Sequence, residues 1–352
     1  MSNILSQPSK PTSGIKDPPK IALIGCGAIA KEYYLPALTR DTYILNNLVL
    51  VDSHRERAQK LATKFEVARY IVDYHEVLDE VEGVIIAVPT HLHHPITMEF
   101  LSRGVHVLCE KPLAESANKA RMMVEQARKT GVALAVNYLQ RLIPSFAKVK
   151  ELLAEKTLGE PLSITYFVGE EFKWPTVSGF YFNSPISSGG VLRDRGAHVF
   201  DHICWWLGEK PKLVSSQNDA FGGREAVAYV QFEHQKCIGE VKLSWLASFP
   251  CRFMVECERG TIEGDVYDYQ SILLKRGVGQ NQRINLKSRD KTKVDIACKV
   301  VANFMRVVKN NELPLVSGSD VLDSIKFIDE CYEAATRFDM PWYEIRELNS
   351  GS

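Results

Sequence analysis

A glycine-rich turn directly after a short apolar segment is the feature that most restricts how this chain can fold. Residues 20–24 have the pattern of a buried strand, which is followed at once by the turn Gly25-Cys26-Gly27-Ala28-Ile29-Ala30. In this spacing the first glycine permits a tight turn, the second lets the backbone approach a pyrophosphate, and a small third residue lets a helix pack on the strand. We therefore expect a parallel α/β sheet that binds a dinucleotide at the helix N-terminus. The residues assigned to the dinucleotide here are Gly25, Gly27, Ala28, Ile29 and Ala30.

An acidic residue after the second predicted strand strengthens this interpretation. That strand covers residues 48–51 and leads into Asp52, about 25 residues after the second glycine. A carboxylate at this distance is the expected acceptor for the ribose hydroxyls of adenosine, and it disfavours the 2′-phosphate of NADP. We assign Asp52 and Ser53 to the cofactor and favour NAD, while nearby Arg55 keeps NADP as the alternative. A solvated turn aspartate is the alternative interpretation of Asp52.

The loop after the predicted strand 84–88 contains three histidines, in the run Pro89-Thr90-His91-Leu92-His93-His94. Ligands of parallel α/β sheets bind outside the carboxyl ends of the strands, so this loop is expected near the nicotinamide ribose. We assign Pro89, Thr90 and His93 to the cofactor. No spaced acidic or cysteine ligand accompanies the histidines, and we therefore expect no metal site.

The segment 189–208, GGVLRDRGAHVFDHICWWLG, predicts a helix with one apolar side and one chemically reactive side. The apolar stripe recurs at spacings of seven, four and three residues and consists of Leu192, Val199, Ile203 and Trp206. Asp194, His198 and Asp201 fall together on the other side, with Asp194 and His198 roughly 6 Å apart along the axis. This side either faces a cleft or belongs to a partly solvated surface helix whose charges are paired.

Three motifs in this order carry a resemblance to a known family. They are Gly25-x-Gly27-x-x-Ala30, the Glu-Lys-Pro of residues 110–112, and GG-x-x-x-D-x-G-x-H-x-x-D from Gly189 to Asp201. With them, nearly all of the chain after the N-terminal tail resembles the Gfo/Idh/MocA family of nicotinamide-dependent sugar and cyclitol dehydrogenases. The resemblance implies an N-terminal Rossmann domain with a doubly wound parallel sheet, then an α/β domain with a large open, mostly antiparallel sheet. It also implies homodimers or homotetramers.

The resemblance assigns roles to individual residues as well. It places Lys111, Asp194 and His198 in the catalytic group. It places Lys111 beside the substrate and the nicotinamide ribose, and it implies a cis peptide bond between Lys111 and Pro112. We assign Glu110 to the cofactor together with Lys111. A solvated surface cation is the alternative for Lys111.

Further residues are assigned to the substrate. Tyr138 and Arg141 keep the Asn-Tyr…Arg pattern of the family, although they could equally pack and form salt bridges at the domain junction. Trp174 belongs to a set of aromatic residues before the reactive helix that either stack on a sugar ring or pack their loop. The set consists of Phe172, Trp174, Phe180 and Tyr181.

Arginines flank Asp194 at positions 193 and 195, where the family motif does not require them. Arg195 could grip a phosphate or carboxylate with its planar fork, which would indicate an anionic substrate. Such a substrate would be a nucleotide-linked sugar, a sugar phosphate or a uronate. Pairing of Arg195 with a structural carboxylate such as Glu170 or Glu171 is the alternative.

The pattern divides the chain into a flexible tail over 1–19, a dinucleotide-binding Rossmann domain over 20–138, and a substrate-binding and oligomerisation domain over 139–345. Strand patterns dominate the last part, at residues 162–168, 213–218, 226–232, 237–246, 252–257 and 260–266. Helices are predicted at 295–309 and 320–337, the second with Ser319 or Asp320 as its cap.

Composition excludes several classes of protein. The 43 basic and 43 acidic side chains balance, which argues against a nucleic-acid partner. No run approaches the ~18 apolar residues of a membrane span, and the N-terminus lacks the apolar core of a signal peptide. The eight cysteines form no CxxC pair. We expect a cytoplasmic protein with reduced, mostly buried thiols.

Together these features predict an oxidoreductase that moves a hydride between a nicotinamide cofactor and a secondary alcohol or ketone of a sugar, cyclitol or sugar derivative. His198 has the intrinsic pKa for proton exchange near neutrality, and Lys111 supplies a donor for the developing alkoxide. Asp194 binds a neighbouring hydroxyl or tunes the base. Two alternatives remain: a dinucleotide-bound sensor, which would need no proton relay, and an enzyme that uses the nicotinamide transiently to eliminate or hydrolyse a bond.

Overall fold

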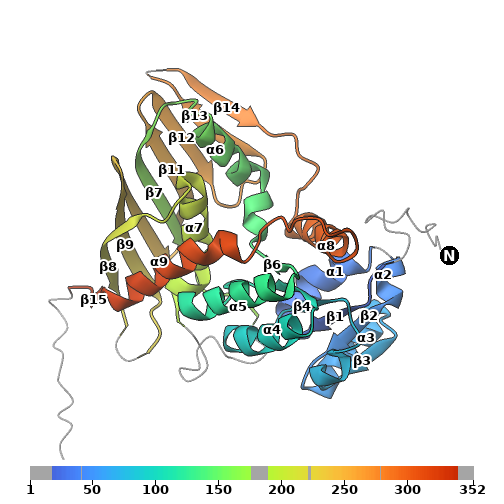
Figure 1. Ribbon diagram of the computed structural model, residues 1–352. Coiled ribbons are helices and arrows are strands. Elements are labelled where there is room, and N and C mark those ends of the chain that lie inside the picture. The colour runs from blue at the N-terminus through green and yellow to red at the C-terminus, as the bar shows by residue number, and fades with distance from the viewer. Residues whose placement is uncertain (1–17, 41, 176–188, 221–222, 278, 340–352) are drawn as a thin grey trace, which may run out of the picture.

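The computed structural model describes residues 18–40, 42–175, 189–220, 223–277 and 279–339, which form two sheets with helices packed around them (Figure 1). The first sheet is parallel, in the order β3-β2-β1-β4-β5-β6. Its strands are β1 (Ile21–Ile24), β2 (Leu48–Val51), β3 (Arg69–Ile71), β4 (Gly83–Ile86), β5 (His106–Cys109) and β6 (Leu134–Val136). The order reverses between β1 and β4, and ligands of such sheets bind at this reversal.

Both faces of the first sheet are covered, as its continuous apolar strands require. Alternate residues of β1 enter two separate cores: Ile21 and Leu23 join one, and Ala22 and Ile24 join the other. The helical elements of this part are η1 (Ala30–Tyr34), α1 (Leu35–Leu38), α2 (Thr42–Asn46), α3 (Arg55–Phe65), η2 (Tyr74–Val77), η3 (Thr90–Leu92), α4 (His93–Ser102), α5 (Ala117–Thr130) and η4 (Leu139–Leu142).

The second sheet has nine strands in the order β14-β13-β12-β11-β7-β10-β9-β8-β15 and is mostly antiparallel. Its strands are β7 (Pro161–Gly169), β8 (Lys212–Asn218), β9 (Val227–His234), β10 (Cys237–Ser244), β11 (Phe249–Cys257), β12 (Gly260–Asp265), β13 (Ser271–Lys275), β14 (Asn281–Asn285) and β15 (Ala335–Arg337). Helices α6 (Pro144–Ala154), α7 (Val191–Leu207) and α9 (Leu322–Glu333) pack against one face (Figure 1). The two sheets confirm the expected fold class.

Four strands, β3, β13, β14 and β15, are missing from the sequence prediction. β14 has the polar sequence NQRIN and is largely exposed, so neither hydrophobicity nor alternation marks it as a strand. β15 takes up the end of the predicted helix 320–337, because the chain leaves α9 at Glu333 and pairs with β8.

The predicted cap of that helix was also wrong. A short turn, η5 (Ser319–Val321), precedes α9, whose N-cap residue Val321 makes no side-chain capping bond. The Asp320 carboxylate instead accepts a hydrogen bond from the backbone N–H of Ser317 at 2.7 Å.

Helix α8 (Lys293–Asn310) comes late in the chain but packs against η1 and α1 of the first domain (Figure 1). A Cβ placed on Gly83 at the start of β4 would lie 2.9 Å from Val308 and 3.3 Å from Phe304, so helix and strand touch closely. Near its C-terminal end, Lys309 Nζ lies 2.9 Å from a carboxylate oxygen of Glu82. A helix that lies in the chain between β14 and β15 of the second sheet therefore helps to cover the first sheet.

All eight cysteines are free thiols, seven of them buried and Cys298 partly exposed. Among the described residues, every helix is too short or too polar to cross a lipid bilayer.

Candidate active site

A cleft of about 610 Å³ runs along the carboxyl edge of the first sheet and reaches the first turns of α7. It brings together most residues that the sequence assigned to a site. The lining includes Gly25, Gly27, Ala28, Ile29, Asp52, Ser53, Pro89, Thr90, Glu110, Lys111, Trp174, Asp194, Arg195 and His198. Four assigned residues do not line it: Ala30, His93, Tyr138 and Arg141.

The glycine turn after β1 has the geometry that its sequence requires. Gly25 has φ of +99°, and a Cβ there would lie 2.3 Å from the carbonyl oxygen of Ala87, so no other residue fits. At Gly27 an added Cβ would meet nothing within 4 Å, which leaves the backbone open to the cleft. Ala30 is fully buried beneath the turn, where its small side chain lets the helix pack.

Asp52 connects this turn to the loop after β2. Its carboxylate accepts hydrogen bonds from the backbone N–H of Cys26 at 2.9 Å and of His54 at 2.8 Å. Arg57 Nε lies 3.5 Å from the same carboxylate and lines the cleft, whereas Arg55 is exposed and does not. Asp52 is thus a buried, organised acceptor and not a solvated turn residue, and the cation beside it is Arg57.

Two predicted residues hold the cleft walls together. Glu110 accepts hydrogen bonds from the Tyr34 hydroxyl at 2.8 Å and from Asn137 Nδ2 at 2.6 Å. His93 is buried outside the cleft. Its Nδ1 lies 2.9 Å from the carbonyl oxygen of Pro112, and its Nε2 lies 2.9 Å from the carbonyl oxygen of Val88. His93, which the sequence assigned to the cofactor, thus connects the loops that follow β4 and β5 and does not line the cleft.

Lys111 and Asp194 form a partly buried ion pair in the cleft. Lys111 Nζ donates to Asp194 Oδ1 at 2.9 Å and to the Asp194 carbonyl oxygen at 3.2 Å. Both side chains are only 16% and 17% exposed. Burial alone would raise the pKa of Asp194, but the charges of Lys111 and Arg195 hold it below its ordinary value. An ammonium offers three donors, so one remains for a ligand. The Lys111–Pro112 peptide bond is cis, as the resemblance implies.

His198 lies one turn further along α7 and also lines the cleft. Its Nδ1 is buried and has no hydrogen-bond partner among the described residues. Burial and the nearby charge of Lys111 lower the pKa of His198 well below 6.5. The imidazole is therefore neutral at pH 7 and can accept a proton.

The first turn of α7 is held from outside the helix by a buried glutamate. Glu225 Oε1 accepts hydrogen bonds from the backbone N–H groups of Gly190 at 2.9 Å and Leu192 at 3.1 Å. The Tyr332 hydroxyl donates to the same oxygen at 2.6 Å. Unpaired N–H groups at a helix start need such partners, and here a residue from the loop before β9 fixes the turn that carries Asp194.

Asp201 does not join the reactive group, although it shares a side of the helical wheel with Asp194 and His198. It is buried and forms a bidentate pair with Arg141, at 2.8 Å from Nε and 2.7 Å from Nη2. Arg141 also donates to the carbonyl oxygen of Asp320 at 2.9 Å. The pKa of Asp201 is raised to about 6, because burial outweighs the neighbouring guanidinium. Tyr138 is 1% exposed and packs edge-on against His198. The structure thus favours packing and salt bridging over substrate contact for Tyr138 and Arg141.

The arginines that flank Asp194 and the aromatic residues before α7 have different partners. Arg195 Nη2 lies 3.3 Å from Glu170 Oε2. Arg195 thus forms the structural ion pair that is the alternative to its binding an anionic substrate. Arg193 pairs with Asp329 at 3.0 Å, away from the cleft. Trp174 lines the cleft and stacks on Tyr33, with ring centres 6.1 Å apart. Phe172 lines the cleft too, and Phe180 and Tyr181 lie outside the described residues.

Several cleft residues were not found from the sequence, above all Arg57, Gln140 and Lys293. Arg57 could have been found, because the first turn of a helix after β2 starts at the ligand-binding edge. Lys293 carries no local signal, since only the return of α8 to the first domain brings it to the cleft.

Both parts of the chain match models of one protein family. Residues 19–138 match the family model described as "Oxidoreductase family, NAD-binding Rossmann fold", and residues 146–263 match the GFO/IDH/MocA C-terminal domain. The chain is 28% identical over 208 residues to a 1,5-anhydro-D-fructose reductase of Ensifer adhaerens, covering 58% of this chain and 62% of that protein. It is 32% identical over 197 residues to a D-glucoside 3-dehydrogenase of Escherichia coli K12, covering 54% of each.

The alignments thus span little more than half of these relatives. In fold the agreement is wider: a levoglucosan dehydrogenase in complex with NADH and levoglucosan superposes with a TM-score of 0.79 over 89% of this chain and 96% of that one, at 18% identity. The two matched models together cover most of the described residues, and they correspond to the two sheets in order. On this basis the chain is a member of the Gfo/Idh/MocA oxidoreductase family.

Proposed function

We propose that this protein is an NAD-dependent oxidoreductase that interconverts a secondary alcohol and a ketone on a sugar, cyclitol or sugar derivative. The observation that carries the proposal is the cleft that joins the glycine turn and Asp52 to Lys111, Asp194 and His198. The residues fit a dinucleotide, because Gly27 opens the backbone to the cleft and Asp52 stands as an acceptor at the end of β2. The named activities of the relatives point to the same chemistry.

A nicotinamide dinucleotide supplies the hydride acceptor or donor when bound, and the chain's own side chains handle the proton and the charge. In oxidation, neutral His198 takes the proton from the substrate hydroxyl as the hydride leaves the carbon. Lys111 donates its remaining hydrogen bond to the same oxygen, where negative charge develops. Asp194 holds the Lys111 ammonium in place at 2.9 Å. In reduction the proton returns from His198.

A panel of sugars, cyclitols and nucleotide sugars with each cofactor, followed by nicotinamide absorbance, tests the proposal. Net formation of NADH with a substrate supports simple dehydrogenation. Product formation without net NADH would instead identify transient use of the nicotinamide. Cofactor binding without turnover on any substrate would support the sensor alternative.

We expect the protein to bind NAD(H) at least about tenfold more tightly than NADP(H), or roughly 1.4 kcal/mol. The Asp52 carboxylate would face the 2′-phosphate, and Arg57 at 3.5 Å offsets only part of that repulsion. Calorimetric titration with both cofactors measures the difference. Arg57→Ala should widen the preference for NAD(H), with the exposed Arg55→Ala as the control. A preference of the parent protein for NADP(H) would contradict the assignment.

We further propose a homodimer or homotetramer formed through the face of the second sheet that lies opposite α6, α7 and α9. Val214 on β8 and Ile238 on β10, two strands of the same sheet that are separated by β9, are 57% and 66% exposed, which is unusual for large apolar side chains. Light scattering should give a mass above that of the monomer, and Ile238→Glu should reduce it. A monomeric parent protein at micromolar concentration would refute this.

We place the enzyme in the cytoplasm, where its eight free thiols stay reduced.

A further inference from the structure

Lys293 brings a charge into the cleft that no other described residue neutralises. It is the first residue of α8, is largely withdrawn from solvent and lines the same cleft as Lys111 and Asp194. Within the described ranges, its ammonium has neither an ion-pair nor a hydrogen-bond partner. A partly buried ammonium without a partner is costly, so its presence in a cleft calls for an explanation.

Among the described residues, Lys293 and the charged groups that act on it comprise three cations and two carboxylates. Three cations meet in this part of the cleft, namely Lys111, Arg195 and Lys293. Two carboxylates face them: Asp194 pairs with Lys111 at 2.9 Å, and Glu170 pairs with Arg195 at 3.3 Å. Burial and the charges of Arg195 and Lys111 lower the pKa of Lys293. An anion placed beside Lys293 would relieve this repulsion.

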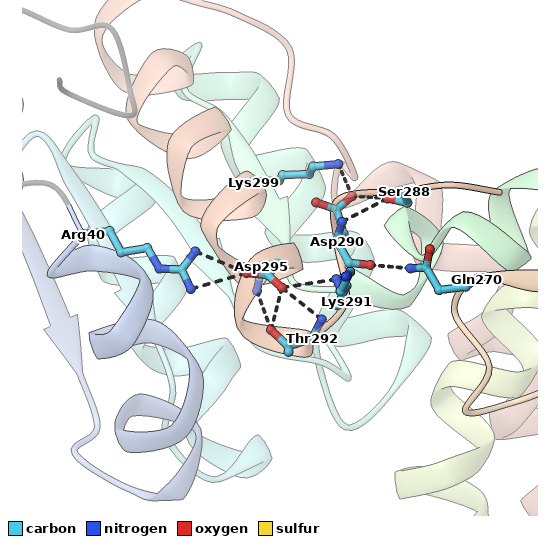
Figure 2. Close-up of polar contacts among 8 residues, drawn as sticks. All are labelled: Arg40, Gln270, Ser288, Asp290, Lys291, Thr292, Asp295 and Lys299. Atoms are coloured by element: carbon cyan, nitrogen blue, oxygen red, sulfur yellow. Dashed lines mark hydrogen bonds and ion pairs between the residues drawn. The ribbon is translucent and has the colours of Figure 1, made fainter. Parts of the chain in front are cut away.

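The backbone that carries Lys293 is held in place from both domains (Figure 2). Thr292 and Asp295 form a capping box, and the Asp295 carboxylate also lies 3.3 Å from Arg40 of the first domain. On the other side, Gln270 Nε2, from the loop before β13, donates to the Asp290 carbonyl oxygen at 2.6 Å, and Lys299 pairs with the Asp290 carboxylate. A cation on so well-anchored a turn binds a ligand with little additional ordering cost.

We propose that Lys293 binds an oxyanion carried by the substrate, so that the enzyme acts on a sugar or cyclitol bearing a carboxylate or a phosphate group. The inference rests on the proposed function and names its substrate class. It moves the anion-binding role from Arg195, whose guanidinium already has Glu170 as partner, to Lys293, which has no such partner among the described residues. Because Lys293 lies with Lys111 and Asp194 and not at the glycine turn, the anion belongs to the substrate and not to the dinucleotide pyrophosphate.

The test compares the full-length protein with Lys293→Met, which removes the charge and keeps most of the side-chain volume. Lys291→Met is the matched control, because Lys291 is exposed, lies two residues away and does not line the cleft. Glucose, glucuronate and glucose 6-phosphate are titrated calorimetrically into each NAD-loaded protein, and NAD is titrated into each free protein. NADH formation is followed in parallel.

The parent protein should bind at least one anionic sugar more tightly than glucose. Lys293→Met should weaken the binding of that sugar by about 10- to 100-fold, which is the contribution of a charge-assisted hydrogen bond. The affinities of Lys293→Met for glucose and NAD, and all affinities of the Lys291→Met control, should equal those of the parent. If Lys293→Met loses affinity for glucuronate alone, the group that Lys293 binds is a carboxylate. If it loses affinity for glucose 6-phosphate alone, that group is a phosphate. Equal binding of charged and neutral sugars by the parent, or a loss of NAD affinity in Lys293→Met, overturns the inference. Failure to form NADH with any substrate counts against the proposed function alone, since the binding titrations do not depend on turnover.

Discussion

Lys111→Ala and His198→Ala are each expected to lower turnover by about 10²- to 10⁴-fold, the usual contribution of a positioned acid, base or charge. Lys111→Ala removes the donor that stabilises charge on the reacting oxygen and releases Asp194 from its 2.9 Å contact. His198→Ala removes the group that exchanges the proton. Steady-state kinetics on a substrate that the parent enzyme oxidises measures both effects.

Cofactor binding and pH dependence separate these roles from general damage to the fold. Among the described residues, no hydrogen bond joins Lys111 or His198 to the Gly25–Ile29 turn, so NAD affinity should change little. Because the pKa of His198 is lowered well below 6.5, oxidation by the parent should stay constant as pH falls through 6.5 and decline only when the imidazole is protonated at lower pH. His198→Ala should lack that decline. Near-normal turnover in either variant would refute the assigned roles.

Arg141→Met is expected to destabilise the protein by about 3–5 kcal/mol, because it leaves a buried carboxylate without its partner. Asp201 is 1% exposed, and both of its oxygens accept hydrogen bonds from Arg141. Urea denaturation at pH 7 measures the loss, with the exposed Arg55→Met as the control. The double variant Arg141→Met/Asp201→Leu should recover most of it, since an apolar pair of similar size avoids the unpaired charge.

The cost of Arg141→Met should also depend on pH. The pKa of Asp201 is about 6 in the parent, above its ordinary 3.8, and loss of the guanidinium raises it further. Below the raised pKa the folded variant holds a proton that the unfolded chain releases, so the loss should be smaller at pH 5 than at pH 8. A loss below about 1 kcal/mol at pH 8 would show that Arg141 and Asp201 are not a tightly coupled buried pair.

The parts of the fold that the sequence predicts well are those whose signals are local. Apolar runs such as IALI and LVLV identified buried parallel strands, and the spacing of Gly25, Gly27 and Ala30 placed a phosphate-binding turn between strand and helix. Lys111, Asp194 and His198 were recognised because they sit in short linear motifs. In the structure all three line one cleft.

What the sequence could not predict depends on contacts between distant segments. Asp201 matches Asp194 on the helical wheel but lies roughly 10 Å further along the axis, where Arg141 covers it. Glu225 and Lys293 come from other elements, and no spacing rule connects them to α7. The polar strand β14 forms because its backbone pairs with β13, which side-chain pattern alone does not reveal.

The return of α8 to the first domain also determines when that domain can be completed during synthesis. All six strands of the first sheet lie before residue 137, yet Phe304 and Val308, which touch the start of β4, leave the ribosome only after the entire second sheet except β15. Chains grow at about 5–20 residues per second, so the surface around Gly83 stays uncovered for several seconds or more. The nascent first domain is therefore completed only when α8, which follows β14 in the chain, has been synthesised, and Lys293 joins the cleft in the same late step.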